Sequence, residues 1–300
     1  MGNFELSICV VTMNRANQLK DALESCINCN LPQNTEFVII DNASTDNTQE
    51  ITFKVLENSG YRFYYEKLPE NLGVGGGRNY AFKKCSGKYI YVLDDDAVVS
   101  TENVDFFTMA IEYFNKYDDI VTLTTQIYDT ALEDNRLSIV GKIIYDGLYP
   151  CKMFCGGSHF LRKEFFEEPP YFNNKYGYEE IPPSLYVADA GKKNVFCPEL
   201  LIIHKPTIDK WDKTKKENID ILINDCATVY ALKKMLYPCV FSLLLSFAYH
   251  KRCKLYLKDR DSKKQADKLA KNILRKYPKM KKIKITTVVE EYKKFGLSVF

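Results

Sequence analysis

Short apolar runs alternate with stretches of helical periodicity along the first third of the chain. The first run, residues 6–12 (LSICVVT), is continuous, as in strands that are buried on both faces. The next apolar residues recur at helical spacing over 19–27. Further strands are expected over residues 37–40, 61–65 and 89–93, and further helices over 51–56 and 78–85. This order predicts a doubly wound, mostly parallel α/β sheet that is flanked by helices.

Polar residues gather directly after three of these predicted strands. They form the clusters 12–15 (TMNR), 41–44 (DNAS) and 94–96 (DDD). The carboxyl ends of parallel strands meet at one edge of a sheet, and ligands bind beyond that edge. The sequence therefore predicts one ligand site that these three clusters share.

The second half of the chain has a different pattern. It is mixed over residues 120–165, and helical periodicity returns at Ile219 and continues into a lysine-rich end. We expect a sheet-forming part over residues 1–212 and a basic, mostly helical C-terminal region over residues 213–300. No low-complexity linker separates them.

Composition and charge limit the class of protein. The chain is 46% hydrophobic and 27% charged, which excludes a disordered chain, a collagen and a polytopic membrane protein. Its net charge of +3 hides an asymmetry: residues 1–204 hold 18 basic and 29 acidic residues, and residues 205–300 hold 24 and 10. A basic region of this kind can meet phosphates on lipid or nucleic acid, or it can be a solvated lysine-rich helical surface.

The three carboxylates of Asp94, Asp95 and Asp96 carry the sharpest chemical signal. Neighbouring carboxylates repel one another unless a cation compensates them. Hard oxygen ligands at this spacing suit Mg²⁺ or Mn²⁺, which bind through one or two carboxylates and substrate phosphates. The alternative is an acidic surface turn, but the triplet directly follows the buried run YIYVL.

Six segments of the chain resemble, in order, the inverting glycosyltransferases of family 2. They span roughly residues 5–210 and are SICVVTMNR, FVIIDNASTDNT, ENLGVGGGRNYAF, YVLDDDAVV, CGGSHFLRK and YEEIPPSLYVADAGKKN. The resemblance implies the GT-A fold with a C-terminal helical extension. It also makes residues 1–212 the nucleotide-sugar-binding and catalytic domain.

The resemblance further implies a donor site. Its residues would be Thr12, Asn14, Arg15, Asp41, Ser44, Asn71, Gly75, Arg78, Asp94 and Asp95. Asp41 would accept from the N3–H of the base, although it could instead be a helix N-cap. Arg78 would pair with the donor phosphate or position its loop, and a surface salt bridge is the alternative. The glycines after Asn71 would let the backbone approach the donor.

Inverting transfer needs a base for the acceptor hydroxyl and a cation for the leaving diphosphate. By resemblance, Asp94, Asp96 and His204 would hold the metal, although His204 could simply end its strand. Glu180 would be the base, with Glu179 as the alternative. Glu179, Gly156 and Gly157 would line the acceptor side. The sequence departs from the family here, because Glu replaces the usual Asp and an expected Arg further on is absent.

An apolar stretch beside basic residues marks the C-terminal region. Met235 to Tyr249 is shorter than a spanning helix and is followed by Lys251, Arg252, Lys254 and Lys258. Residues 235–260 would therefore make peripheral membrane contact, or would form a packed hairpin or a homodimer interface. Nucleic-acid binding is not expected, because stacking aromatics do not alternate with the basic residues.

These observations predict a metal-dependent, inverting, non-processive glycosyltransferase that uses Mn²⁺ or Mg²⁺. It would move a sugar from a UDP- or dTDP-sugar to a hydroxyl of a saccharide or lipid-linked glycan, in surface polysaccharide synthesis. The Q-x-x-R-W segment of processive synthases is missing around Trp211. Scattered cysteines and a start without signal-peptide features predict a cytoplasmic location, on the inner face of the membrane. The alternatives are a sugar-phosphate nucleotidyltransferase and an inactive GT-A-like scaffold.

Overall fold

The computed structural model describes residues 4–136, 138–175, 177–206, 218–277 and 279–300. These residues divide into two compact units, which are described separately. The first comprises the described residues up to 187 together with 191–206, and the second comprises 188–190 and the residues from 218 onward. The predicted boundary between residues 212 and 213 lies outside the described residues.

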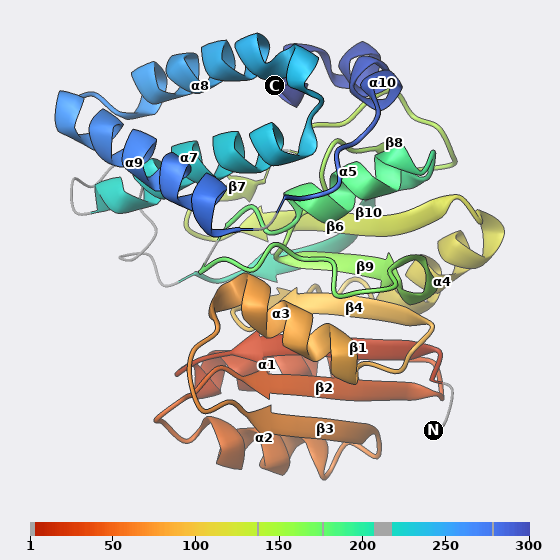
Figure 1. Ribbon diagram of the computed structural model, residues 1–300. Coiled ribbons are helices and arrows are strands. Elements are labelled where there is room, and N and C mark those ends of the chain that lie inside the picture. Colours follow the sequence, from red (N-terminus) through yellow and green to blue (C-terminus); the bar gives the residue numbers. More distant parts are fainter. Residues whose placement is uncertain (1–3, 137, 176, 207–217, 278) are drawn as a thin grey trace. The chain divides into compact units, whose positions relative to one another are not determined.

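A ten-stranded sheet forms the centre of the first unit (Figure 1). Its main path runs in the order β3 (Arg62–Lys67), β2 (Thr35–Asp41), β1 (Leu6–Thr12), β4 (Tyr89–Asp94), β9 (Ser158–Arg162), β6 (Ile120–Asp129), β10 (Lys193–His204) and β5 (Ala97–Val99). Two short strands lie off this path: β7 (Asp134–Asn135) pairs with β6, and β8 (Tyr149–Pro150) pairs with β10.

Four of the seven strand pairings along the main path are parallel. β1 pairs in parallel with β2 and with β4, so that Thr12 lies opposite Asp41 and Val11 lies opposite Asp94. β9 is antiparallel to both β4 and β6, and β6 is parallel to β10, with His204 opposite Asp129. The ends of β1, β2, β4, β6 and β10 therefore meet at one edge of the sheet. The predicted fold class is confirmed.

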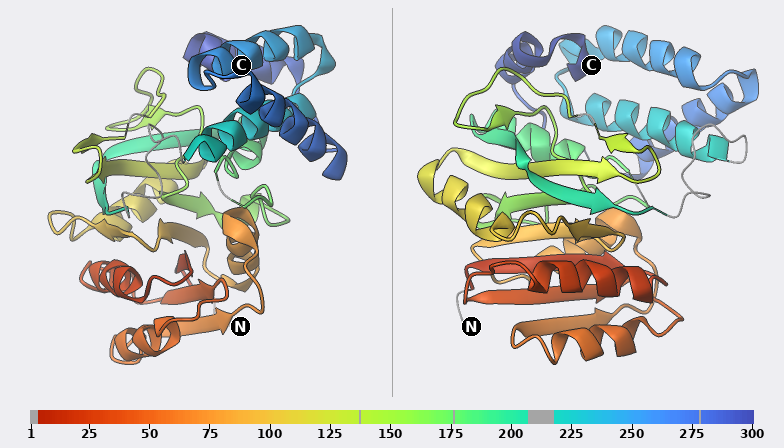
Figure 2. Two further views of the ribbon diagram at one scale, coloured as in Figure 1. Left: turned by 90° about the vertical axis from the view of Figure 1, so that its left-hand side faces the viewer. Right: turned by 180° about the vertical axis from the view of Figure 1, so that it is seen from behind.

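Helices cover both faces of this sheet because its strands are apolar on both sides. α1 (Ala16–Ile27), α2 (Thr48–Leu56) and α4 (Phe106–Lys116) lie on one face, and α3 (Gly73–Lys84) lies on the other (Figure 2). Alternate residues of β1 show the division: Ile8 packs in one hydrophobic cluster with Leu23, and Cys9 packs in the other with Phe82. The remaining helical segments are η1 (Lys163–Phe165) and α5 (Ile181–Asp189).

Two helices begin at other residues than the pattern predicts. α3 begins at Gly73 instead of Arg78, because glycines are poor helix formers and hide its first turns from a propensity argument. α2 begins at Thr48 instead of Ile51, and Asp46 just before it accepts a hydrogen bond from the Thr48 backbone nitrogen at 3.1 Å. All ten cysteines are free, and Cys239, which belongs to the apolar stretch from Met235 to Tyr249, is exposed.

The second unit is helical. It contains α7 (Ile219–Leu236), η3 (Cys239–Phe241), α8 (Ser242–Tyr256), α9 (Arg260–Lys276), α10 (Ile285–Phe295) and η4 (Gly296–Val299). Its small core joins α7 to α8 and α9 through Cys226, Tyr249 and Ala266. Among the helices that the structure describes, none combines the length and the hydropathy needed to cross a membrane.

Candidate active site

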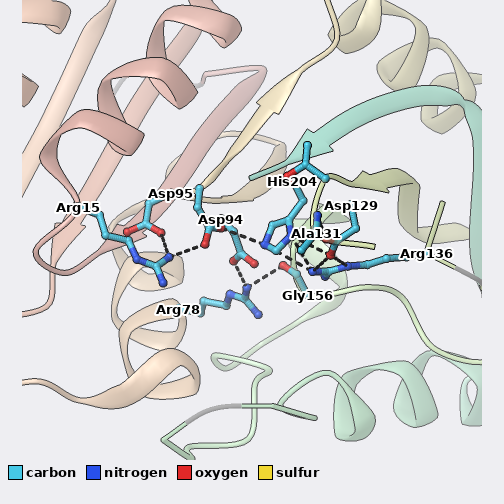
Figure 3. Close-up of polar contacts among 11 residues, drawn as sticks. Arg15, Arg78, Asp94, Asp95, Asp129, Ala131, Arg136, Gly156 and His204 are labelled. Atoms are coloured by element: carbon cyan, nitrogen blue, oxygen red, sulfur yellow. Dashed lines mark hydrogen bonds and ion pairs between the residues drawn. The ribbon is translucent and has the colours of Figure 1, made fainter. Parts of the chain in front are cut away.

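Three predicted metal ligands meet at the carboxyl edge of the sheet. Asp94 ends β4, Asp96 lies in the turn before β5, and His204 ends β10. One ligand atom from each residue lies within 4.8 Å of the others. Figure 3 shows Asp94 and His204 in a row of charged side chains that runs from Arg15 to Arg136. The two carboxylates are suitable ligands for Mn²⁺ or Mg²⁺.

His204 is held by carboxylates on both sides of its ring. Its Nε2 lies 3.2 Å from Asp96 Oδ1, and its Nδ1 lies 3.1 Å from Asp129 Oδ2. Burial opposes protonation, but the hydrogen bond with Asp96 and the charge of Asp96 together raise the pKa of His204. Asp96 beside Nε2 and Asp129 beside Nδ1 hold the ring in place. This geometry disfavours a histidine that merely ends a strand.

Sequence reasoning missed two members of this row, Asp129 and Arg136. Arg136 donates from Nε and Nη2 to Asp129 Oδ2, at 2.9 and 2.7 Å, and its Nη2 lies 2.8 Å from His204 Nδ1. Asp129 ends the buried strand β6, which is the same signal that singled out Asp41 and Asp94. Arg136 follows a short strand in an irregular segment, and nothing in its sequence context marked it.

Arg15 fixes the other two carboxylates of the triplet. Its Nη1 donates to Asp95 Oδ1 at 2.8 Å and to Asp96 Oδ2 at 2.7 Å. Burial raises the pKa of Asp95 to about 6, although Arg15 lowers it. Burial acts in the same direction on Asp96, but the hydrogen bond and charges of His204 and Arg15 outweigh it and lower the pKa of Asp96. The acidic surface turn is therefore wrong, because both side chains are buried.

The predicted nucleoside residues form an ordered loop network around the end of β2. Asp41 is buried and accepts from the Ser44 backbone nitrogen at 2.7 Å and from the Tyr65 hydroxyl at 2.6 Å. Ser44 Oγ in turn accepts from the Asn14 backbone nitrogen at 2.8 Å. Thr12 is buried at the adjacent end of β1. Asp41 is not the N-cap of α2, because that helix begins four residues beyond Ser44.

Arg78 is buried among the carboxylates of the site. The residue is only 3% exposed, which excludes a surface salt bridge. Its Nη2 donates to Asp94 Oδ1 at 2.6 Å and to the Gly156 carbonyl at 2.7 Å. Its Nη1 donates to Glu179 and lies 3.4 Å from Glu180 Oε1. Both terminal nitrogens of Arg78 are therefore engaged with protein groups.

Glu179 and Glu180 lie immediately before α5, at its N-terminus, where a helix stabilises negative charge. Both are buried, and Glu179 Oε2 has no hydrogen-bond partner among the described residues. Burial and the charge of Glu179 raise the pKa of Glu180 well above its ordinary value, against the effect of Arg78. A Cβ at Gly156 would lie 1.8 Å from Glu180 Oε1, so a side chain at this position would displace the carboxylate.

The glycine-rich start of α3 packs against protein. A Cβ at Gly75 would lie 1.9 Å from the Phe172 carbonyl oxygen, so this glycine lets two chain segments approach each other. The Asn71 side chain accepts from the Gly73 backbone nitrogen at 2.7 Å, and Gly157 would place a Cβ 3.2 Å from Asp94 Oδ2. Gly75 thus lets the backbone approach Phe172 closely. The predicted contact between Gly75 and the donor stays a prediction.

Comparison with known families and curated proteins points to sugar transfer. The model of the family described as Glycosyl transferase family 2 matches residues 7–168, which is more than half of the chain. The poly-beta-1,6-N-acetyl-D-glucosamine synthase of Staphylococcus epidermidis is 29% identical over 138 residues, covering 46% of this chain and 31% of that protein. An uncharacterized glycosyltransferase of Rickettsia felis is 31% identical over 101 residues, covering 34% and 16%. The chain thus spans less than a third of the length of these relatives.

Solved structures of similar fold extend over nearly the whole chain. Residues 1–349 of S. aureus TarS, in complex with UDP-GlcNAc, align with a TM-score of 0.65 at 13% identity, covering 92% of this chain and 82% of that one. The mannosyltransferase PcManGT of Pyrobaculum calidifontis, with GDP-Man and Mn²⁺, gives 0.58 at 13%, covering 100% and 82%. GalNAc-T7 with UDP, GalNAc and Mn²⁺ gives 0.66 at 13%, covering 99% and 59%. At these identities the likeness shows a shared GT-A fold.

Proposed function

The chain belongs to glycosyl transferase family 2, and we propose that it is a metal-dependent, inverting, non-processive enzyme acting on a nucleotide-diphosphate sugar. One observation carries the proposal. Arg78 contacts Asp94, one of the three candidate metal ligands, and also Glu179, one of the two candidate catalytic glutamates. The residues for the metal and the residues for the acceptor therefore lie next to each other. Trp211, from which the non-processive character was inferred, lies outside the described residues.

The loop network at the ends of β1 and β2 would bind the donor nucleoside, with UDP or dTDP as its nucleotide. Asp41 would accept from the imide N–H of the base, while Thr12, Asn14 and Ser44 would hold the nucleoside. Asp41 already accepts from Ser44 and Tyr65, and these contacts fix its carboxylate in place. UDP or a UDP-sugar occupies two of the similar structures.

Arg15, Asn71, Gly75 and Asp95 would complete the donor site. Arg15 lies beside the triplet and has a side chain that is 26% exposed. It could therefore reach the donor, whereas Arg78 is buried beneath Asp94. We accordingly assign Arg78 to positioning the carboxylates.

Asp94, Asp96 and His204 would hold Mn²⁺ or Mg²⁺. Their atoms lie close enough to share one ion, and Asp129 orients the imidazole from behind. The side chain of Asp94 is 34% exposed, which leaves an approach for donor phosphate. When bound, the cation would neutralise the charge that grows on the leaving diphosphate. Mn²⁺ accompanies two of the similar structures.

Glu180 would act as the base that takes the proton from the acceptor hydroxyl. Its raised pKa increases its basicity, and Arg78 contacts it more distantly than it contacts Glu179. Glu179 would bind acceptor hydroxyls through Oε2, the atom that lacks a partner among the described residues. Gly156 and Gly157 would line the same side and leave room for the acceptor.

The acceptor would be a hydroxyl of a saccharide or a lipid-linked glycan, in the synthesis of a surface polysaccharide on the cytoplasmic side of the membrane. The name of the S. epidermidis relative, a poly-beta-1,6-N-acetyl-D-glucosamine synthase, supports polymer synthesis. In this proposal residues 1–212 perform the transfer, and the C-terminal region contributes contacts outside it.

Neither alternative class has comparable support. A sugar-phosphate nucleotidyltransferase would have a glycine- and lysine-rich loop after β1, where this chain has Thr12 to Arg15. An inactive scaffold would have no reason to keep Asp96, Glu179 and Glu180 buried together with their charges.

A panel of UDP- and dTDP-sugars tests the proposal with Mn²⁺, Mg²⁺ or EDTA present. We expect metal-dependent release of nucleoside diphosphate from at least one donor, and transfer when a saccharide acceptor is added. Loss of release in EDTA would support the metal role. If no donor gave turnover and none bound, the proposal that the protein is an enzyme would be refuted.

A further inference from the structure

Large apolar side chains are exposed on one side of α8 and on the turn before it. We call Val240, Leu243, Leu244, Phe247 and Leu255 the outer face of α8. Leu243 is 86% exposed, Phe247 is 70% exposed and Val240 is 69% exposed. Ten of the nineteen exposed large hydrophobic residues of the described chain belong to the second unit, although this unit is the smaller one. Contiguous exposed apolar surface of this kind marks a binding surface.

The internal packing of the second unit leaves the outer face uncovered. Leu245, Tyr249 and Cys253 follow one another at four-residue spacing and are buried. Leu243, Phe247 and Lys251 repeat at the same spacing on another side of the helix, where they are exposed. The core of the unit is therefore complete without the outer face, and the apolar residues there are available to a partner.

The C-terminal residues enlarge this surface. Phe300 packs against Phe241 just before α8, with ring centroids 5.8 Å apart, and against Tyr292 of α10 at 6.1 Å. Leu297, next to this aromatic group, is 71% exposed. The start of α8 and the end of α10 therefore lie side by side, as Figures 1 and 2 also show.

Charge identifies the kind of partner. No acidic residue occurs between Asp225 and Asp259, a stretch that holds six lysines and arginines. Residues 218–300 contain 19 basic and 7 acidic residues, a net charge of +12. A second copy of this unit would bring one strongly positive surface against another, which like-charge repulsion disfavours. An anionic surface is complementary to it.

We propose that the outer face of α8 docks on an anionic lipid bilayer. Leu243 and Phe247 would enter the interface between headgroups and acyl chains, while Lys251 and Lys254 would contact lipid phosphates. The helix would lie on the membrane, since no described helix is suited to span it. This inference concerns the second unit and does not depend on the reaction proposed for the first.

Co-sedimentation with vesicles tests this proposal on the full chain. We expect binding to vesicles of phosphatidylcholine with phosphatidylglycerol, much weaker binding to phosphatidylcholine alone, and a loss of binding as salt rises. Leu243→Ser and Phe247→Ser should each weaken binding about tenfold or more, because each removes most of a large apolar side chain that would be buried in the bilayer. Lys251→Gln with Lys254→Gln should flatten the salt dependence.

Matched variants on the first unit provide the control. Leu132→Ser removes an exposed leucine, whose 66% is close to the 70% of Phe247, and Lys54→Gln with Lys83→Gln removes two exposed lysines. These variants should bind vesicles like the unaltered chain. No sedimentation with anionic vesicles, or equal binding of Phe247→Ser, would overturn the proposal. The proposal would also be overturned if the chain did not bind vesicles and light scattering showed a dimer that Phe247→Ser converts to a monomer. The partner of the outer face of α8 would then be a second copy of the chain. Nucleotide binding, measured on the same preparations, reports separately on the proposed transfer function.

Discussion

The two units of this chain place their charges differently. In the first unit, Arg78 is 3% exposed and contacts the carboxylates of Asp94 and Glu179 inside the protein. In the second unit, lysines such as Lys251 and Lys254 are exposed beside uncovered leucine and phenylalanine. Buried, paired charges need a fixed geometry, whereas exposed charges of one sign act at longer range on whatever approaches. In the first unit the charged residues therefore hold a site in a fixed geometry, and in the second unit they form an exposed basic surface.

The largest effect is expected at the metal-ligand group. Asp96→Asn should lower the rate of sugar transfer by more than about a hundredfold, since even residues behind a metal ligand typically contribute ten- to a hundredfold. The expected loss is in kcat, measured at saturating Mn²⁺ with the folded state checked by circular dichroism. Unchanged activity would remove Asp96 from the metal site.

The glutamate pair should give the next largest effect. Glu180→Gln should reduce transfer roughly a hundred- to ten-thousandfold, because the amide cannot take a proton, while donor binding stays intact. Glu179→Gln is the matched variant, and it should act mainly on acceptor KM. If Glu179→Gln is the more damaging change in kcat, the assignment of the base is off by one residue.

The free energy of unfolding should depend on the buried Arg78 much more than on the exposed Lys254. Arg78→Ala should lower the free energy of unfolding by roughly 3–5 kcal/mol, because it leaves buried carboxylates without their cation. Lys254→Ala should change it by less than about 0.5 kcal/mol, as is usual for exposed positions. Urea unfolding of the two variants measures both values. Equal effects would contradict the contrast between the units.

A smaller, graded effect is expected from pH. A metal needs the neutral imidazole of His204, and Asp96 raises the pKa of that ring, so its proton stays bound to higher pH than usual. Mn²⁺ affinity should therefore fall as pH is lowered, about tenfold per unit once His204 is protonated. Titration of Mn²⁺ without nucleotide between pH 8 and 6 measures the slope, and a flat profile would exclude His204 as a ligand.

The strand-end side chains were the part of the site that sequence could predict. Asp41, Asp94 and His204 each end a buried strand, and parallel pairing brings such ends together. Asp129 carries the same signal and could have been included. The partners of Arg78 could not be predicted, because Glu179 lies 101 residues away and the contact depends on the packing of α3 beside residues 172–175.

The C-terminal region shows the opposite limit of sequence reasoning. Its apolar pattern predicts a helix near residues 235–249, and α8 begins there at Ser242. Periodicity could not tell which side of this helix is buried, because both Leu243 and Leu245 are apolar. The buried side of α8 is set by the packing of α7 and α9 around Tyr249 and Cys253. Tertiary packing, not local pattern, thus exposes the outer face.

The central claim is that the ends of β1, β2, β4 and β10 form one metal-dependent nucleotide-sugar site. A thermal-shift measurement with nucleoside diphosphates and their sugars tests it most directly, because a ligand that binds only the folded state raises the Tm. We predict that at least one uridine or thymidine diphosphate raises the Tm with Mn²⁺, and that EDTA or Asp96→Asn abolishes the increase. The account would be contradicted if the increase in Tm persisted in EDTA and in Asp96→Asn, or if no nucleotide raised the Tm at all.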